Sequence, residues 1–336
     1  MILFVYSNIG CSCTRKCTFE LVDELKKYTQ VTSMYFKNLN KESIKEYNLI
    51  IFQRVGTAGN VTDSDAEEMI EIIKENKNKK KFIYMIDDLV INARDGLPKK
   101  IIEVCDAVMC TSVTLKKYIE PYNKNIYLFH TFVNFEMYQE IPKSNYNDFT
   151  VVWASTGGLG KDIINKILLA KERIGEDVKF IIIGGKSEEF NNFSFVETYP
   201  IVAENELIKI IKGSDILLNP MTISDEIEIV IRSFADNVND FINCKSEVKY
   251  AMAGASKTCL LTSPIENYIK VITNGVNGFI IDNDAEMWIE KIKYLYKNRD
   301  IKNMVVMNAY NHIKNEYTQS KVAKDIYGIL QQIAIS

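Results

Sequence analysis

Short apolar runs alternate with amphipathic stretches along the whole chain. Residues 2–7 (ILFVYS), 82–87 (FIYMID) and 149–156 (FTVVWAST) are typical of buried strands. Between such runs, stretches such as 17–28 and 65–81 carry apolar residues at the spacing of one helix face. Continuous apolar strands separated by helices indicate a parallel sheet that is covered on both faces. The sequence therefore predicts an α/β fold.

The alternation is interrupted once, by the polar stretch 140–149, which contains a proline. Further strands are predicted on both sides of it, at 47–53, 106–112, 126–132, 178–186, 214–220, 258–263 and 278–282. A length of 336 residues also fits two domains of roughly 150 residues each. We expect two Rossmann-like domains facing each other across a cleft, at 1–143 and 149–320. Residues 321–336 are expected to form a helix that packs back on the first domain.

Composition restricts the classes of partner. The chain has 41 Lys and Arg against 44 Asp and Glu, so its net charge of -3 gives no general attraction to nucleic acid. No apolar run approaches the roughly 20 residues that span a bilayer, and no export signal is evident, so we expect a cytoplasmic protein. The basic residues 77–81 fit a solvated helix end better than peripheral contact with a membrane surface, which stays an alternative.

Three of the seven cysteines, Cys11, Cys13 and Cys17, lie together in CSCTRKC. The spacing superficially resembles a metal site, but the chain has only two histidines and neither is close in sequence. Free or buried thiols at a loop-to-helix junction are the favoured interpretation, and no metal is expected.

Several catalytic motifs are missing. Neither half has the G-x-G-x-x-G spacing of a dinucleotide site, and Gly160-Lys161 is followed by Asp162, which rules out a Walker A loop. A G-x-S-x-G nucleophile elbow is also absent. Dehydrogenase, nucleoside triphosphatase and hydrolase functions are therefore disfavoured.

What remains is a pattern suited to an anion. In TGGLGKD (156–162), a glycine-rich turn opens a helix, so its backbone N–H groups can bind phosphate oxygens beside Lys161. A merely tight strand-to-helix turn explains the same letters about equally well. Lys245 and Lys249, four residues apart in NCKSEVKYAMAG, are able to add positive charge.

The order of motifs in the second half resembles that of group 1 glycosyltransferases of the GT-B fold. SDILLNPM, then NDFINCKSEVKYAMAG, then TCLLTSPIENYIKVITNGVNGFIID follow the order found in that family. The matching positions are Asp215, Pro220, Lys245, Ser246, Lys249, Gly275, Asn277, Gly278 and Phe279. In the first half, CDAVMCTSVTLKKYI and YLFHTFVNFEMY agree more loosely.

This resemblance implies an enzyme that transfers a sugar from a nucleotide-diphosphate sugar, with a UDP-sugar favoured. The acceptor would be a glycan, a glycan-lipid or a protein, transfer would retain the anomeric configuration, and no metal would be required. The C-terminal domain would bind the donor and the N-terminal domain the acceptor. The expected donor-site residues are Thr156, Gly157, Gly158, Lys161, Gly184, Lys245, Ser246, Lys249, Glu266 and Asn267.

Two family features are missing: an arginine near Ser155-Thr156 and a glutamate after Lys249. They motivate an alternative, a catalytically degraded GT-B protein that serves as a binding or scaffold subunit of a glycosylation complex. On the acceptor side, Asp87 and Asp88 end a strand, where ligand-facing residues of such sheets gather. Asp87 is our candidate catalytic residue, and Arg54 is a candidate for contacting substrate oxygens.

Overall fold

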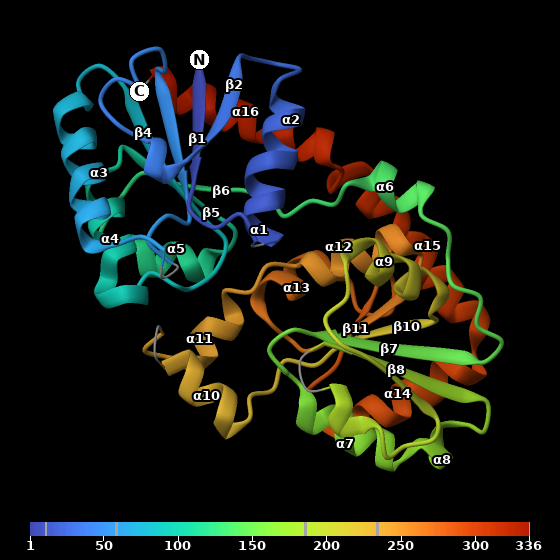
Figure 1. Ribbon diagram of the computed structural model, residues 1–336. Coiled ribbons are helices and arrows are strands. Elements are labelled where there is room, and N and C mark those ends of the chain that lie inside the picture. Colours follow the sequence, from blue (N-terminus) through green and yellow to red (C-terminus); the bar gives the residue numbers. More distant parts are fainter. Residues whose placement is uncertain (11, 58–59, 185–186, 233–234, 336) are drawn as a thin grey trace. The chain divides into compact units, whose positions relative to one another are not determined.

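The computed structural model describes residues 1–336 except 11, 58–59, 185–186, 233–234 and 336. Two compact units make up the chain (Figure 1). Unit 1 comprises Met1–Phe132, Ile231–Ser246 and Gln319–Ser336, and unit 2 comprises Val133–Val230 and Glu247–Thr318. The chain thus passes from one unit to the other four times, after residues 132, 230, 246 and 318. Each unit contains a parallel six-stranded sheet, which confirms the predicted α/β fold.

The sheet of unit 1 has the strand order β2-β1-β3-β4-β5-β6. Its strands are β1 (Ile2–Tyr6), β2 (Val31–Tyr35), β3 (Leu49–Gln53), β4 (Lys81–Ile86), β5 (Ala107–Cys110) and β6 (Ile126–Leu128). The helices of this unit are α1 (Ser12–Thr14), α2 (Leu21–Leu25), α3 (Asp63–Asn76), α4 (Ala93–Val104), α5 (Val113–Ile119), α11 (Val238–Asn243) and α16 (Gln319–Ile335). A π-helical turn, Arg15–Glu20, joins α1 to α2, so the helix expected at 17–28 begins earlier and ends at Leu25. A 3-10 turn, Phe36–Asn38, follows β2.

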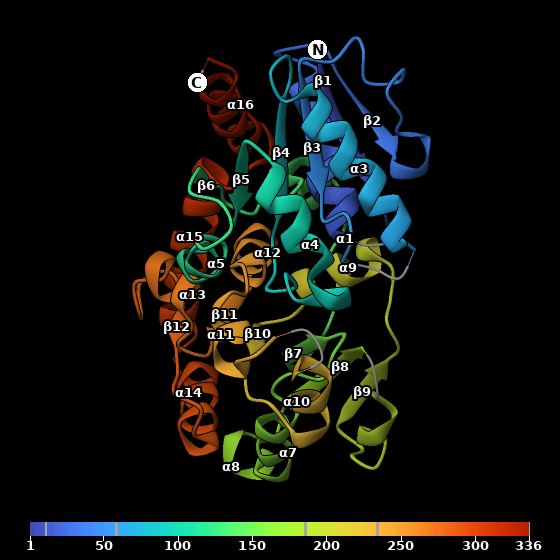
Figure 2. The same cartoon turned by 90° about the vertical axis from the view of Figure 1, so that its left-hand side faces the viewer.

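Alternate residues of these strands face opposite sides of the sheet. Phe4, Ile51 and Ile83 belong to a core cluster with residues of α2 and α16. In Figure 1, α16 (red) lies beside α2 (blue), and the two helices are in contact. Figure 2 shows α3 and α4 over the sheet of unit 1, and these two helices contact each other. The C-terminal helix therefore completes the core of unit 1.

Local sequence signals fix several helix starts in unit 1. Thr62 and Asp65 form a capping box before α3, in which the Asp65 N–H donates to Thr62 Oγ1 at 3.1 Å and the Thr62 N–H donates to Asp65 Oδ2 at 2.7 Å. Ser112 caps α5 by accepting from the Leu115 N–H at 2.9 Å. These caps fix the starts of α3 and α5.

The sheet of unit 2 has the strand order β12-β11-β10-β7-β8-β9. Its strands are β7 (Phe149–Ser155), β8 (Val178–Gly184), β9 (Val196–Tyr199), β10 (Ile216–Asn219), β11 (Cys259–Thr262) and β12 (Phe279–Ile280). Its helices are α6 (Phe135–Glu140), α7 (Lys161–Leu169), α8 (Lys171–Ile174), α9 (Glu204–Gly213), α12 (Val248–Ser256), α13 (Glu266–Val271), α14 (Ala285–Lys297) and α15 (Arg299–Glu316). Helix α10 (Asp225–Arg232) runs from unit 2 into unit 1, and a 3-10 turn, Ser187–Phe190, follows β8.

One face of this sheet packs against α7, α8 and α14 in a cluster that includes Trp153, Ile167 and Trp288. Helix α12 contacts α9, α15 and β11. The tight approach of α12 to α15 depends on Gly254, since a Cβ atom there would lie 2.4 Å from Ile313 Cγ1. The small residues of the YAMAGAS segment are thus used to bring this helix close to its neighbours. The sequence did not predict strand β9.

Candidate functional site

The glycine-rich turn after β7 closes onto the end of β10. Gly160 has φ +86°, and a Cβ atom at this position would lie 2.4 Å from both Cγ and the carbonyl oxygen of Pro220. Its N–H donates to the Thr222 carbonyl at 2.9 Å. Only glycine combines this backbone conformation with so close an approach. Gly160 therefore fixes the start of α7 at Lys161.

The other residues of this turn leave their backbone donors open. Thr156 and Gly157 are exposed and Gly158 is half-buried. Within the described part of the chain, the N–H groups of Thr156, Gly157 and Gly158 make no hydrogen bond. Successive N–H groups before a helix start form a concave site for an anion.

Gly184 ends β8 directly beside this turn. It pairs with Ser155, the last residue of β7. Its φ is +129°, and a Cβ atom there would lie 1.9 Å from the Ser155 carbonyl oxygen. The two strand ends can lie this close only because residue 184 lacks a side chain.

Lys249 brings a positive charge to the same strand end. Its ammonium donates to the carbonyl oxygen of Ala154, in β7. The side chain is half-buried, and burial lowers the pKa of the ammonium to about 8. Removal from water disfavours the charged form, which an arriving anion would favour again.

Lys161, the first residue of α7, has a partner of its own. Its ammonium forms an ion pair with Glu189, in the 3-10 turn after β8. A quarter of the Lys161 side chain is exposed, so the ammonium stays accessible to solvent.

Buried polar residues at the ends of β10 and β11 were missed in the sequence. Asn219 donates through Nδ2 to Thr262 Oγ1 at 2.9 Å, and both side chains are buried. The Ser263 hydroxyl accepts from the Met221 N–H at 2.8 Å. The available signal was the change from apolar to polar at the strand ends, in LLN and LLTS. These bonds hold the carboxyl edge of the sheet together.

Glu266 and Asn267 lie in the first turn of α13. This helix begins at Glu266, with Ile265 at the N-cap position. Glu266 forms an ion pair with Lys270, one turn further along, and Asn267 is buried.

The remaining predicted site residues lie in unit 1. Asp87, directly after β4, accepts from Arg54 Nη1 at 3.0 Å. The same guanidinium nitrogen lies 3.3 Å from Cys13 Sγ. Burial opposes the charge of Arg54, but Asp87 and Asp88 outweigh it and raise the pKa of the guanidinium. Arg54 thus holds Asp87 as a fixed carboxylate.

Lys245 forms an ion pair with Asp88, the residue that follows Asp87. Its Nζ lies 2.8 Å from Asp88 Oδ2 and 3.8 Å from the centre of the Phe241 ring. Ser246, which follows it, is half-buried. Four of the predicted site residues therefore belong to unit 1, namely Arg54, Asp87, Lys245 and Ser246, and the other eight belong to unit 2.

The remaining expectations concern a metal site, the clustered cysteines and a membrane-spanning helix. Among the described residues, no group of three or more His, Cys, Asp or Glu is arranged to hold a metal ion. Cys11, one of the three clustered cysteines, lies outside the described residues. No described helix has the length and apolar character to cross a membrane.

Solved structures with the same architecture are glycosyltransferases. The HepE protein of Anabaena, in complex with UDP and glucose, has a TM-score of 0.68 at 10% identity, over 99% of this chain and 100% of that one. Sucrose-phosphate synthase from Thermosynechococcus elongatus has a TM-score of 0.70 at 11% identity, over 100% of both chains. An α-glucosyltransferase in complex with UDP and a DNA 13-mer has a TM-score of 0.69 at 14% identity, over 98% of this chain and 99% of that one. These likenesses identify the GT-B fold.

Residues 164–328 match the model of a family described as glycosyl transferase-like. The chain therefore has the GT-B fold, and this part of it is similar to glycosyl transferases. The match covers most of unit 2, including α12 and the ends of β10 and β11, where the sequence motifs lie. None of the curated proteins matches its sequence.

Proposed function

We propose that this protein is a glycosyltransferase that takes its sugar from a nucleotide-diphosphate sugar, with a UDP-sugar favoured, and binds this donor on unit 2. The HepE structures with UDP and with UDP-glucose support a uridine nucleotide. The acceptor in this proposal is a glycan, a glycan-lipid or a protein, and transfer retains the anomeric configuration without a metal ion.

The observation that carries this proposal is the turn after β7. Three consecutive residues, Thr156, Gly157 and Gly158, offer backbone N–H groups that no described residue uses. Backbone donors at a helix start bind phosphate through both hydrogen bonds and the helix dipole. Gly184 lies at the neighbouring strand end and keeps side-chain atoms away from this edge.

Two lysines of unit 2 supply charge in this proposal. Lys249 reaches Ala154, two residues before the turn, and Lys161 follows the turn. Both would neutralise the diphosphate as it leaves, which lowers the barrier most when the charges are already in place. Glu266 and Asn267 are assigned to the sugar-bearing part of the donor, as the sequence resemblance implies.

On unit 1 we assign Asp87 to the acceptor hydroxyl. Its ion pair with Arg54 fixes the carboxylate, and a fixed acceptor of hydrogen bonds orients a hydroxyl group well. In the transfer, the acceptor oxygen bonds to the anomeric carbon from the side of the departing diphosphate. The bond from that carbon to the diphosphate oxygen breaks, and this oxygen takes the proton of the acceptor hydroxyl. Catalysis then depends mainly on alignment and on stabilising the leaving diphosphate.

The test is a panel of UDP-, GDP-, dTDP- and CMP-sugars, scored by thermal shift and by slow release of free sugar. We expect UDP-sugars to raise the melting temperature most, because a ligand that binds only the folded state stabilises it. Sugar release should accompany stabilisation and should persist with EDTA present.

Each other outcome of this panel has a definite meaning. Stabilisation without sugar release would replace the enzyme by the binding or scaffold subunit. If none of the nucleotide sugars changes the melting temperature, the donor-site proposal is wrong.

A further inference from the structure

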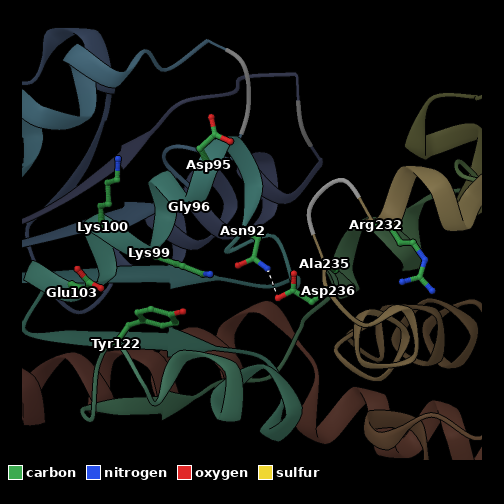
Figure 3. Close-up of a pocket in the computed structure, with 10 residues that line it drawn as sticks. All are labelled: Asn92, Asp95, Gly96, Lys99, Lys100, Glu103, Tyr122, Arg232, Ala235 and Asp236. Atoms are coloured by element: carbon green, nitrogen blue, oxygen red, sulfur yellow. Dashed lines mark hydrogen bonds between the residues drawn. The ribbon is translucent and has the colours of Figure 1, made fainter.

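Unit 1 contains a cavity that is lined by none of the predicted site residues. Its volume is about 510 Å³, within the range of about 300 to 1,000 Å³ that small-molecule sites occupy. Helix α4 supplies one wall, Tyr122 lies below, and Arg232, Ala235 and Asp236 also line the cavity (Figure 3). All of these elements belong to unit 1.

The wall on α4 is made by residues that share one helix face. Asn92 caps the N-terminus of α4, and Lys99 lies about two turns further on, seven residues away. Both side chains are half-buried. Figure 3 shows both side chains at the cavity, on the same helix above the Tyr122 ring.

The side-chain amide of Asn92 has a hydrogen-bond partner for its nitrogen but none for its oxygen. Its Nδ2 donates to Asp236 Oδ2 at 2.9 Å, which fixes the direction of the amide. Its Oδ1 is buried and has no hydrogen-bond partner. A buried carbonyl oxygen without a donor is costly, so this group favours a ligand that carries one.

Lys99 and Tyr122 complement this acceptor. The Lys99 ammonium lies 5.2 Å from the centre of the Tyr122 ring, and in the described part of the chain it makes no ion pair with a carboxylate. The Tyr122 hydroxyl likewise makes no hydrogen bond to the described residues. The cavity therefore offers a charged donor, a neutral acceptor and a hydroxyl that can do both.

These three groups select the class of ligand. A phosphate group would suit Lys99, but it has no proton for Asn92 Oδ1 and would approach the Asp236 carboxylate. An apolar ligand would leave all three polar groups without water or partners. A hydroxyl group can accept from Lys99 and donate to Asn92, so neighbouring hydroxyls of a sugar ring match the set.

The rim of the cavity supports the same choice. Its exposed cations, Lys100 and Arg232, together with the half-buried Lys99, balance the three exposed carboxylates of Asp95, Glu103 and Asp236. This balance gives no net attraction for a highly charged ligand of either sign.

We propose that this cavity is a carbohydrate-binding subsite that holds a neutral sugar unit of the acceptor. The inference rests on the proposed function in taking a sugar as its ligand. It narrows that function to acceptors that contain at least one sugar unit besides the hydroxyl that reacts.

The test titrates the full chain, in excess UDP, with methyl glycosides of glucose, galactose, mannose and N-acetylglucosamine. Saturation-transfer NMR detects binding, and calorimetry or NMR titration gives its strength. We expect at least one glycoside to bind, Lys99→Met to weaken it roughly tenfold, and Tyr122→Phe to weaken it about threefold. Lys117→Met, which changes an exposed lysine of α5 outside the cavity, is the matched control and should bind as the wild type does.

Thermal denaturation of each variant shows that it is folded. The inference is overturned if no glycoside binds, or if Lys99→Met binds the glycosides as strongly as the wild type does. It is also overturned if inorganic phosphate binds in this cavity and the glycosides do not. UDP binding to the wild type is measured separately, so loss of the donor site and loss of this subsite are distinguishable.

Discussion

At the scale of single residues, the proposed contact of Lys249 with the donor predicts that donor binding depends on pH. Burial lowers the pKa of its ammonium to about 8, from an ordinary value of 10.5. Above pH 8 the folded protein loses this charge, so we expect UDP affinity to fall by up to about tenfold per pH unit toward pH 9.5. Calorimetric titrations between pH 6.5 and 9.5 measure this, and Lys249→Met should bind weakly with a flat profile.

The same shift affects stability in the opposite direction. Between about pH 8 and 10.5 the unfolded chain holds the Lys249 proton more tightly than the folded one. The free energy of unfolding of the free protein therefore gains from this group as pH rises through that window. A wild-type UDP affinity that is unchanged from pH 7 to 9.5 would remove Lys249 from the donor site.

Gly184 and Gly157 form a matched pair of glycines at the same strand edge. Gly184→Ala places a Cβ atom at 1.9 Å from the Ser155 carbonyl oxygen with φ at +129°, so we expect a loss of about 2 kcal/mol or more of stability. Gly157→Ala meets no atom within 4 Å and should change stability by less than about 0.5 kcal/mol. Urea denaturation compares the two. Equal effects would contradict the close approach of β7 and β8.

Lys245 was expected at the donor diphosphate, and this role stays a prediction. The diphosphate would have to compete with Asp88, which holds the Lys245 ammonium at 2.8 Å. We therefore expect Lys245→Met to weaken UDP binding by less than about fivefold, well below the effect of Lys249→Met. Calorimetry at pH 7 compares the two variants. If Lys245→Met binds UDP as strongly as the wild type does, Lys245 has no part in the donor site and only pairs with Asp88.

At the scale of elements, α16 is a part of the core of unit 1 although it ends the chain. Ile326 is fully buried among residues of the sheet and α2, so Ile326→Ala should cost about 2 to 5 kcal/mol. Ile335, in the same helix, is 88% exposed, and Ile335→Ala should be neutral. Chemical denaturation followed by circular dichroism tests this. A neutral Ile326→Ala would mean that the helix does not pack on the sheet in solution.

Elements also differ in how well the sequence predicts them. Strands such as β4 and β8 follow from continuous apolar runs, because only burial on both faces tolerates them. Strand β9, with the sequence VETY, is half-exposed and has two polar residues, Glu197 and Thr198, so its composition resembles a loop. The π-helical turn at Arg15–Glu20 has no sequence signature of its own, since its pattern is that of an ordinary helix.

At the scale of the whole molecule, the two units report differently on unfolding. Both tryptophans, Trp153 and Trp288, lie in unit 2, so fluorescence excited selectively at tryptophan follows that unit alone. Circular dichroism follows both units. If UDP binds to unit 2 as proposed, it should raise the fluorescence midpoint and leave part of the dichroism transition unmoved. A single transition that shifts as a whole would show that the units unfold together.

The site was predictable where it depends on local sequence and not where it depends on distant partners. The turn at 156–160 follows from glycines between a strand and a helix, which the letters show directly. The ion pairs Lys161–Glu189 and Lys245–Asp88 join residues far apart in the chain. No spacing rule links such residues, because the fold alone brings them together.

The return of residues 231–246 to unit 1 limits how related enzymes can be recombined. This stretch is held there by contacts of Asp236 with Asn92, Asp240 with Tyr118 and Lys245 with Asp88. A chimera joined once, between two parents' halves, would set one parent's stretch against the other parent's partners. If unit 1 binds the acceptor as proposed, exchanging acceptor preference between such proteins requires moving 1–132, 231–246 and 319–336 together.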